Sequence, residues 1–251
     1  MRRDERDLLD DQVRYYRARA FEYDATTTPT GDPFAPYGDA TRVALRAFEP
    51  TGDVLELAAG TGQWTRILAE YATTLTALDA SHEMLKVNRA KVADPAARYL
   101  VADLFAWEPP QAYDVVFFGN FLSHVPLALF SRFWDLVAHC LRPDGRVFFV
   151  DEADHGIWNE RWIDRPGGVV QRTLTDGTQH RAVKVLWHPD DLATRLVELG
   201  WDASVHPEGP FYWGTAIPGG SGRANAVLGD QSIVTHGTSP ITHASWPGGT
   251  S

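Results

Sequence analysis

Short apolar segments alternate with amphipathic stretches through the middle of the chain, between about residues 50 and 150. Segments that are apolar throughout suit strands buried on both faces of a parallel sheet, and the stretches between them suit the connecting helices. The predicted strands are 53–57, 74–78, 98–101, 114–118 and 146–150, and the predicted helices between them are 63–71, 81–92 and 127–141. This order predicts βαβ units and a doubly wound, mostly parallel α/β fold.

The pattern differs on both sides of this core. Two helices are predicted before it, at 8–20 and 39–48, and a turn at 142–145 is expected to end the helix that precedes the last core strand. Residues 152–168 show no clear period. Thr175-Asp-Gly-Thr178 then suits the tight turn of a β-hairpin, and a helix at 189–199, ended by Gly200, precedes two closing strands.

The segment after the first predicted core strand carries the strongest chemical signal. Ala58, Gly60 and Gly62 leave room for a ligand against the backbone, and free N–H groups at the helix start favour a polar or anionic group. A dinucleotide-binding turn requires a third glycine where Gln63 stands, so a nicotinamide-dependent oxidoreductase is the least favoured interpretation. Glu56, at the end of the strand, suits a ligand with a cationic amino group rather than a pyrophosphate.

This segment resembles the first motif of the class I S-adenosylmethionine-dependent methyltransferases, an acidic residue followed by a Gly-x-Gly-x-Gly-like turn, with Ala58 in place of the first glycine. The resemblance implies a seven-stranded Rossmann-like sheet, with S-adenosylmethionine as the cofactor. It also implies that Glu56 and the turn hold the methionine end of that cofactor. A strand-turn-helix corner without a ligand is the alternative.

Further positions match the same family in chain order. The resemblance implies that Asp79 binds the ribose hydroxyls beside Ala80, that Met84 packs on the adenine, and that Asp103 and the backbone of Leu104 bind the adenine edge. Each position also has a purely structural interpretation. Asp79 suits a helix cap, although Ser81 is better placed for one; Met84 suits the core, and Asp103 suits a turn.

Two further segments are expected to close over the cofactor, and the first of them is also expected to face the methyl acceptor. Asn120, Ser123 and His124 follow the fourth core strand, where the family closes over the methionine end of the cofactor. His124 is the candidate catalytic residue, as a general base on the acceptor, and the alternative is that it only orders its loop. Tyr16 lies in a helix that resembles the lid of small-molecule methyltransferases, and we expect it to contact the cofactor. The alternative is an amphipathic helix whose tyrosines only pack against the domain.

The charge and composition of the chain limit the kinds of substrate, metal and compartment to be expected. The formal net charge is -10 and no basic strip interrupts it, so nucleic acid is disfavoured and a small-molecule acceptor is expected. No apolar stretch is long enough to span a membrane, and the single cysteine, Cys140, fits a reducing cytoplasm. The acidic stretch 151–155 lacks an acidic partner at the end of the fourth strand, so no metal site is expected.

These observations predict a methyltransferase domain at residues 1–216. It includes an N-terminal lid at 1–30 and an insertion with a hairpin at 152–187, and a flexible tail rich in Gly, Ser and Thr follows at 217–251. The predicted activity is methyl transfer to an O, N, S or C atom of a small molecule. An RNA or protein methyltransferase and a catalytically silent cofactor-binding subunit are also compatible with the sequence, and the oligomeric state stays open.

Overall fold

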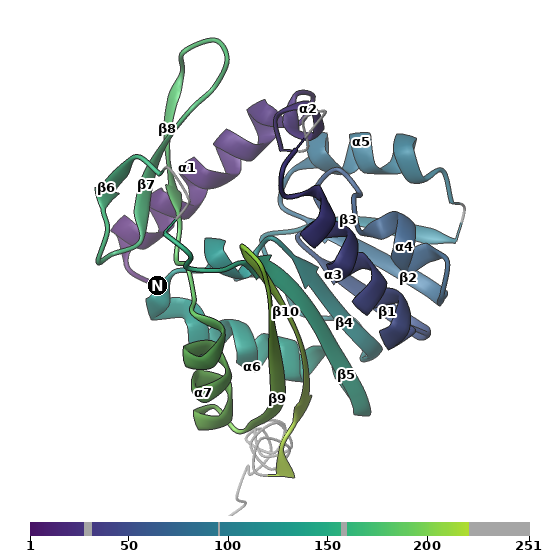
Figure 1. The fold of residues 1–251 in the computed structure, drawn as a ribbon. Helices are drawn as coiled ribbons and strands as arrows, with labels where there is room; N and C mark the ends of the chain where they lie inside the picture. Colours follow the sequence, from purple (N-terminus) through teal and green to yellow (C-terminus); the bar gives the residue numbers. More distant parts are fainter. Residues whose placement is uncertain (28–31, 95, 157–159, 221–251) are drawn as a thin grey trace, which may run out of the picture.

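The computed structural model describes the chain except for residues 28–31, 95, 157–159 and 221–251. Within the described residues, a seven-stranded sheet has the order β3-β2-β1-β4-β5-β10-β9 (Figure 1). Its strands are β1 (Gly52–Leu57), β2 (Ala72–Asp79), β3 (Ala97–Val101), β4 (Tyr113–Gly119), β5 (Leu141–Glu152), β9 (Trp201–Glu208) and β10 (Phe211–Pro218). The strands β1 to β5 are parallel, and β10 pairs antiparallel with both β5 and β9. The predicted doubly wound, mostly parallel sheet is confirmed.

Alternate residues of each central strand serve opposite faces of the sheet. In β4, Val116 and Phe118 face one core with α6 (Phe130–Cys140) and α7 (Pro189–Glu198), whereas Val115 and Phe117 face a second core with α3 (Ala35–Phe48) and α4 (Thr65–Ala69). The helix α5 (His82–Val92) lies beside α4. Burial on both faces explains why the strands have no polar alternation in the sequence. Truncating Phe117 or Phe118 to alanine would therefore cost about 3–5 kcal/mol of stability.

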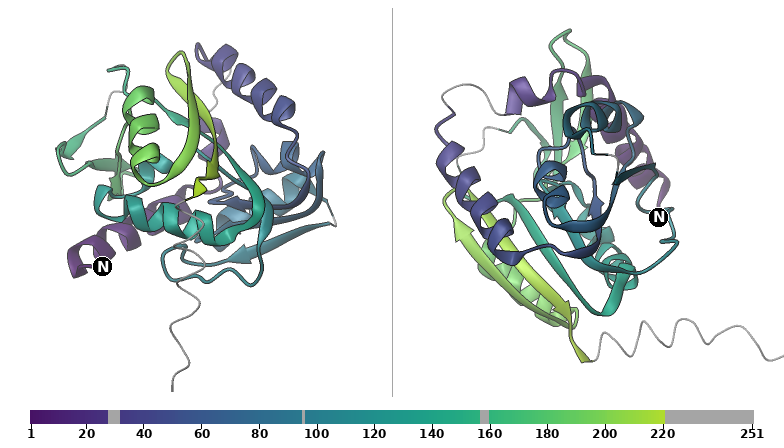
Figure 2. Two further views of the ribbon diagram at one scale, coloured as in Figure 1. Left: turned by 90° about the horizontal axis from the view of Figure 1, so that it is seen from below. Right: turned by 90° about the vertical axis from the view of Figure 1, so that its right-hand side faces the viewer.

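The insertion between β5 and α7 folds as a small antiparallel sheet of its own. Its strands are β6 (Trp162–Asp164), β7 (Val169–Thr173) and β8 (Gln179–Val183), in that order. The predicted hairpin is confirmed, since Thr173 pairs with Gln179 and Val169 with Val183. The helix α1 (Arg3–Arg19) packs along β8, and the short helix α2 (Tyr23–Thr27) follows it (Figures 1 and 2).

Several boundaries differ from the sequence-based prediction. Residues 142–145 do not form a separate turn but belong to β5, where the register shifts between the pairs Tyr113–Leu141 and Val115–Arg146. Arg142 in this irregular stretch forms ion pairs with Asp53 and Asp114, which join three neighbouring strands. The predicted helix at 127–141 is divided into a 3₁₀ turn, η2 (Leu127–Leu129), and the helix α6, which ends at Cys140. The elements α2 and β6 were not predicted.

Candidate functional site

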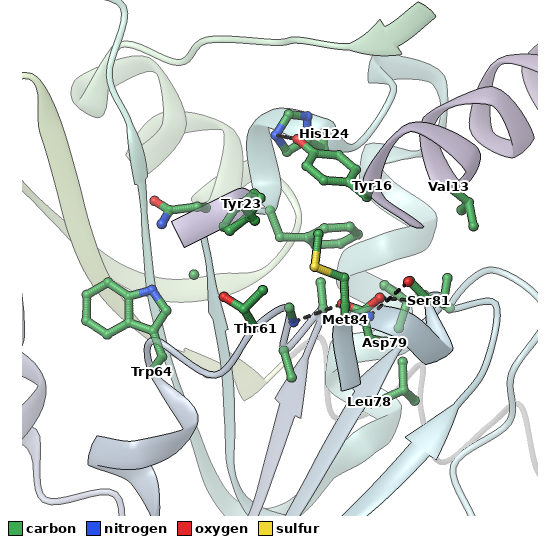
Figure 3. A pocket seen from close by; sticks show the side chains of 18 of the residues that line it. Val13, Tyr16, Tyr23, Thr61, Trp64, Leu78, Asp79, Ser81, Met84 and His124 are labelled. Carbon is green, nitrogen blue, oxygen red and sulfur yellow. Dashed lines mark hydrogen bonds between the residues drawn. The ribbon is translucent and has the colours of Figure 1, made fainter. Parts of the chain in front are cut away.

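A cavity of about 870 Å³, including its mouth, lies at the carboxyl ends of β1, β2 and β4 and beneath α1 (Figure 3). The chain changes direction across the sheet between β1 and β4, which is where open α/β sheets bind ligands. The lining residues are Gln12, Val13, Tyr16, Tyr23, Ala58, Ala59, Gly60, Thr61, Gln63, Trp64, Leu78, Asp79, Ala80, Ser81, Met84, Ala102, Leu104, Gly119, Asn120, Phe121 and His124.

The turn between β1 and α4 forms the floor of the cavity. Ala58, Gly60 and Gly62 all have positive φ, at 53°, 53° and 89°. Asn88 of α5 braces the turn from behind by donating to the carbonyl of Gly60 at 3.3 Å and to the hydroxyl of Thr65 at 2.7 Å. A Cβ on Gly62 would lie 2.7 Å from the Asn88 side chain, whereas a Cβ on Gly60 would meet nothing closer than 4.0 Å. The turn is thus packed underneath and open towards the cavity.

Asp79, the last residue of β2, holds the adjoining wall. Its Oδ2 accepts the N–H of Gly60 at 2.9 Å, and its Oδ1 accepts the N–H of Ser81 at 2.7 Å. Burial raises the pKa of Asp79, and these backbone N–H groups oppose the shift. Each carboxylate oxygen keeps a further lone pair for a ligand hydroxyl. Ser81 caps α5 by accepting the N–H of Met84 at 3.1 Å, so Met84 is fixed in the wall while Asp79 remains available to a ligand.

The third side of the cavity is the end of β4. Asn120 has φ 54°, a left-handed conformation that asparagine tolerates better than most residues, and its N–H donates to the carbonyl of Val150 at 2.8 Å. The preceding Gly119 leaves room for Trp64, because a Cβ there would lie 2.5 Å from the indole nitrogen. Trp64 lines the cavity, a role that no motif in the sequence predicted.

Three of the expected cofactor residues do not line this cavity. Gly62 lies behind the turn, against Asn88. Glu56 is buried below the turn, 1% exposed, and its Oε2 has no hydrogen-bond partner among the described residues. Burial raises the pKa of Glu56 to about 8. Asp103 is exposed and borders a neighbouring hollow between α1 and β3, where it lies 3.9 Å from Arg6.

His124 and Tyr16 form the side of the cavity opposite Asp79 and Ser81 (Figure 3). The 3₁₀ turn η1 (Leu122–His124) presents His124, whose Nδ1 lies 2.7 Å from the carbonyl oxygen of Val183 and whose Nε2 lies 2.8 Å from the hydroxyl of Tyr16. Burial, together with the positive charges of Lys184 and Arg172, lowers the pKa of His124 well below its usual value. The imidazole is therefore neutral at neutral pH.

Gln12 fixes α1 over the cavity. Its side-chain amide donates to the carbonyl of His124 at 3.3 Å, and its amide oxygen accepts the N–H of Val183 at 2.9 Å. The preceding residue, Asp11, accepts the N–H of Arg181 at 3.0 Å. These bonds join α1 to η1 and β8, and the sequence did not indicate them because they span more than a hundred positions of the chain.

A second polar cluster lies behind His124 and was also missed. Lys184 is 2% exposed and pairs with Glu152, while its Nζ lies 3.5 Å from the hydroxyl of Ser123. Asp151 accepts the N–H of Ser123 at 2.8 Å, and burial raises the pKa of Asp151 to about 6. Asp151 is thus engaged with the backbone. Among the described residues, no group of three or more His, Cys, Asp or Glu side chains could hold a metal ion.

The comparisons with known proteins agree with this geometry. A family model described as a methyltransferase domain matches residues 54–145. The structure of the DhpI–SAH complex has 42% sequence identity and a TM-score of 0.74 over 85% of this chain and 98% of that chain. The chain belongs to the class I S-adenosylmethionine-dependent methyltransferases. Its cofactor is S-adenosylmethionine, as the resemblance in the glycine turn predicted.

Two further relatives of this methyltransferase extend the comparison. The DhpI–SAM–HEP complex has 44% identity and a TM-score of 0.74, and the match covers 84% of this chain and 98% of that chain. A ubiquinone biosynthesis O-methyltransferase from Xylella fastidiosa (strain 9a5c) is 31% identical over 100 residues, or 38% of this chain and 39% of that relative. In the described part of the chain, no helix is both long and apolar enough to cross a membrane.

Proposed function

We propose that this methyltransferase modifies a small molecule that occupies the main cavity together with S-adenosylmethionine. The observation that carries the proposal is the position of α1, which Gln12 ties to both His124 and Val183 over the cavity. Small-molecule sites are concave cavities that bury most of the surface of their ligand, and α1 covers this cavity in that way. The net charge of -10 further disfavours nucleic acid, and one relative is described as a complex with SAM and HEP.

We assign the cofactor to the side of the cavity formed by the glycine turn, β2 and β4. Asp79 offers free lone pairs to ribose hydroxyls, and Met84 and Leu104 offer apolar surface to adenine. The unpartnered, buried Oε2 of Glu56 suits the cationic amino group of the methionine end. When bound, S-adenosylmethionine supplies an activated methyl group, so the protein mainly aligns the acceptor and excludes water.

The proposed cofactor site combines backbone and side-chain positions: Glu56, Ala58, Gly60, Gly62, Asp79, Ala80, Met84, Asp103, Leu104 and Asn120. Tyr16, which the sequence also predicted at the cofactor, lies beside His124 on the side of the cavity opposite Asp79, so it is left out of this set. A role for Asp103 requires the cofactor to extend towards the hollow beside β3. A cytoplasmic location is part of the same proposal, since the one cysteine of the chain is compatible with a reducing compartment.

The test has two stages. Calorimetry with S-adenosylhomocysteine measures cofactor binding, for which we expect a dissociation constant on the order of micromolar. A methyl-transfer screen with labelled S-adenosylmethionine then offers phenols, alcohols, amines, thiols and carboxylates, next to bulk RNA and unfolded protein. Transfer to at least one small-molecule class supports the proposal. Transfer to RNA or protein, with none to any small molecule, would contradict it.

A further inference from the structure

Both ring nitrogens of His124 are already used within the protein. Nδ1 faces the carbonyl oxygen of Val183, which can only accept a hydrogen bond, so the proton of the ring is on Nδ1. Nε2 faces the hydroxyl of Tyr16 at 2.8 Å. His124 therefore has no free nitrogen to offer to a methyl acceptor unless the bond to Tyr16 breaks.

The charge state of His124 determines the direction of the bond to Tyr16. The imidazole is buried, which disfavours a second ring proton. The positive charges of Lys184 beyond β8, Arg172 on β7 and Arg19 on α1 add to this effect, although Lys184 pairs with Glu152 and Arg172 with Glu160. The ring is thus neutral, its Nε2 carries a lone pair, and the hydroxyl of Tyr16 donates its hydrogen to that lone pair.

This direction leaves the Tyr16 oxygen as an acceptor only. Its single hydrogen is committed to His124, and among the described residues the oxygen makes no other hydrogen bond. Tyr16 lines the cavity on the side opposite Asp79 (Figure 3). Burial also raises the pKa of Tyr16 well above its usual value, so the group is a neutral phenol.

We propose that Tyr16 contacts the methyl acceptor and that His124 is a positioning residue that acts through Tyr16. The Tyr16 oxygen accepts a hydrogen bond from an O–H or N–H group at the atom to be methylated, which orients the remaining lone pair of that atom. When that lone pair takes the methyl group, the electron pair of the broken C–S bond would stay on sulfur as S-adenosylhomocysteine, and the proton of the methylated atom would pass to water. The acceptor class is therefore an alcohol, a phenol or an amine. This inference rests on the proposed small-molecule function.

The first experiment uses the full-length protein and the probes of the screen described above. We expect Tyr16→Phe to lower kcat for alcohol, phenol or amine probes about tenfold or more, because it removes one hydrogen bond to the acceptor. The affinity for S-adenosylhomocysteine should change by less than about twofold. Tyr15→Phe is the matched control, since Tyr15 is the neighbouring residue on α1 and does not line the cavity.

Variants of His124 separate positioning from catalysis. His124→Ala should lower kcat to the same extent as Tyr16→Phe, and the double variant should be no worse than either single variant, because both act on one hydrogen bond. His124→Gln should recover activity, since its amide can accept from Tyr16 and donate to Val183. A further loss when His124→Ala is added to Tyr16→Phe would overturn the proposal.

A spectroscopic measurement tests the hydrogen-bond direction without any activity. In cofactor-free protein with ¹⁵N-labelled histidine, we expect the His124 ring to be neutral, with the proton on Nδ1 and with a Nε2 signal that shifts in Tyr16→Phe. An imidazolium, or a proton on Nε2, would contradict the assignment. If the wild type neither binds S-adenosylhomocysteine nor methylates any probe, the proposed function itself fails. Normal binding, together with transfer only to carboxylates, would overturn this inference alone.

Discussion

The Oδ2 atom of Asp79 accepts the N–H of Gly60 at 2.9 Å, so the end of β2 is tied directly to the glycine turn at the end of β1. The second oxygen of the same carboxylate holds Ser81, the cap of α5. One side chain thus fixes the geometry of two segments that line the cavity. A residue with this position affects both stability and ligand binding, and the two effects can be measured separately.

We expect Asp79→Ala to weaken the binding of S-adenosylhomocysteine by ~1–3 kcal/mol, because ribose hydroxyls would lose a charged acceptor. The N–H groups of Gly60 and Ser81 would also lose their partner, so stability should fall. Asp94→Ala is a matched control, since Asp94 accepts the N–H of Ala96 at 2.8 Å but does not line the cavity. Calorimetry measures the affinity of both variants, and urea unfolding measures their stability. An unchanged affinity in Asp79→Ala would remove Asp79 from the cofactor site.

A second prediction concerns the buried carboxyl of Glu56, whose pKa is raised to about 8. Between pH 4.5 and pH 8 the folded protein keeps this proton while the unfolded chain loses it, so stability falls as the pH rises through that range. Glu56→Gln cannot lose a proton. We therefore expect the variant to be more stable than the wild type near pH 8, by on the order of 4 kcal/mol, and within about 1 kcal/mol of it near pH 5.

The same Glu56→Gln variant should bind S-adenosylhomocysteine more weakly, because a glutamine cannot ionise to pair with the cationic amino group of the methionine end. Urea unfolding at the two pH values and calorimetry at neutral pH measure both effects. A variant that is stabilised at high pH yet binds as well as the wild type would show that Glu56 has no part in holding the cofactor. Equal stability at both pH values would show instead that the buried carboxyl is ionised.

The sheet was accessible from the sequence because its signal is local. Apolar runs such as 114–118 are continuous, since alternate residues of β4 serve two different cores, and the glycine turn follows the first run at once. The first and last residues of helices and strands were harder to predict, because they depend on tertiary contacts rather than on a local pattern. The stretch 142–145 has a typical turn composition, but it extends β5 because Arg142 pairs with Asp53 and Asp114 of neighbouring strands.

The site could be anticipated only where its residues follow strands in a fixed order, as Gly60, Asp79 and Asn120 do. Gln12 and Lys184 come from segments without a motif, and their roles arise from contacts with η1 and β8. The interpretation of His124 also needed the structure. A lone histidine suggests a base, but its contacts with neighbouring groups leave no free nitrogen.

A third prediction concerns the C-terminus. The strand β10 ends at Pro218, and the predicted tail at 217–251 falls largely outside the described residues. Since residues after Pro218 lack an apolar period, deletion after Gly220 should change neither the melting temperature nor the affinity for S-adenosylhomocysteine. Deletion after Gly209, which removes β10 from between β5 and β9, should abolish folding and is the matched control. A loss of many degrees in the shorter deletion would place part of the tail in the domain.

The last prediction follows from the depressed pKa of His124. Burial lowers this pKa, and Lys184, Arg172 and Arg19 add to the effect, while Val183 opposes it through its hydrogen bond. Below about pH 6.5 the unfolded chain takes up a proton at this histidine that the folded protein does not, so folding stability falls as the pH decreases. His124→Gln lacks the titration, and the wild type should therefore lose stability relative to it by up to about 1.4 kcal/mol per pH unit.

Urea unfolding of both proteins between about pH 5 and pH 7.5 measures this difference, and comparison with the variant cancels the opposing contributions of Glu56 and Asp151, whose carboxyl pKa values are raised. Parallel curves would mean that His124 titrates alike in the folded and unfolded states, and they would contradict the neutral imidazole. The pH dependence of turnover is a second test of the neutral imidazole. An exposed histidine base would lose activity below about pH 6, whereas a neutral imidazole that only orients Tyr16 should leave the rate independent of pH in that range.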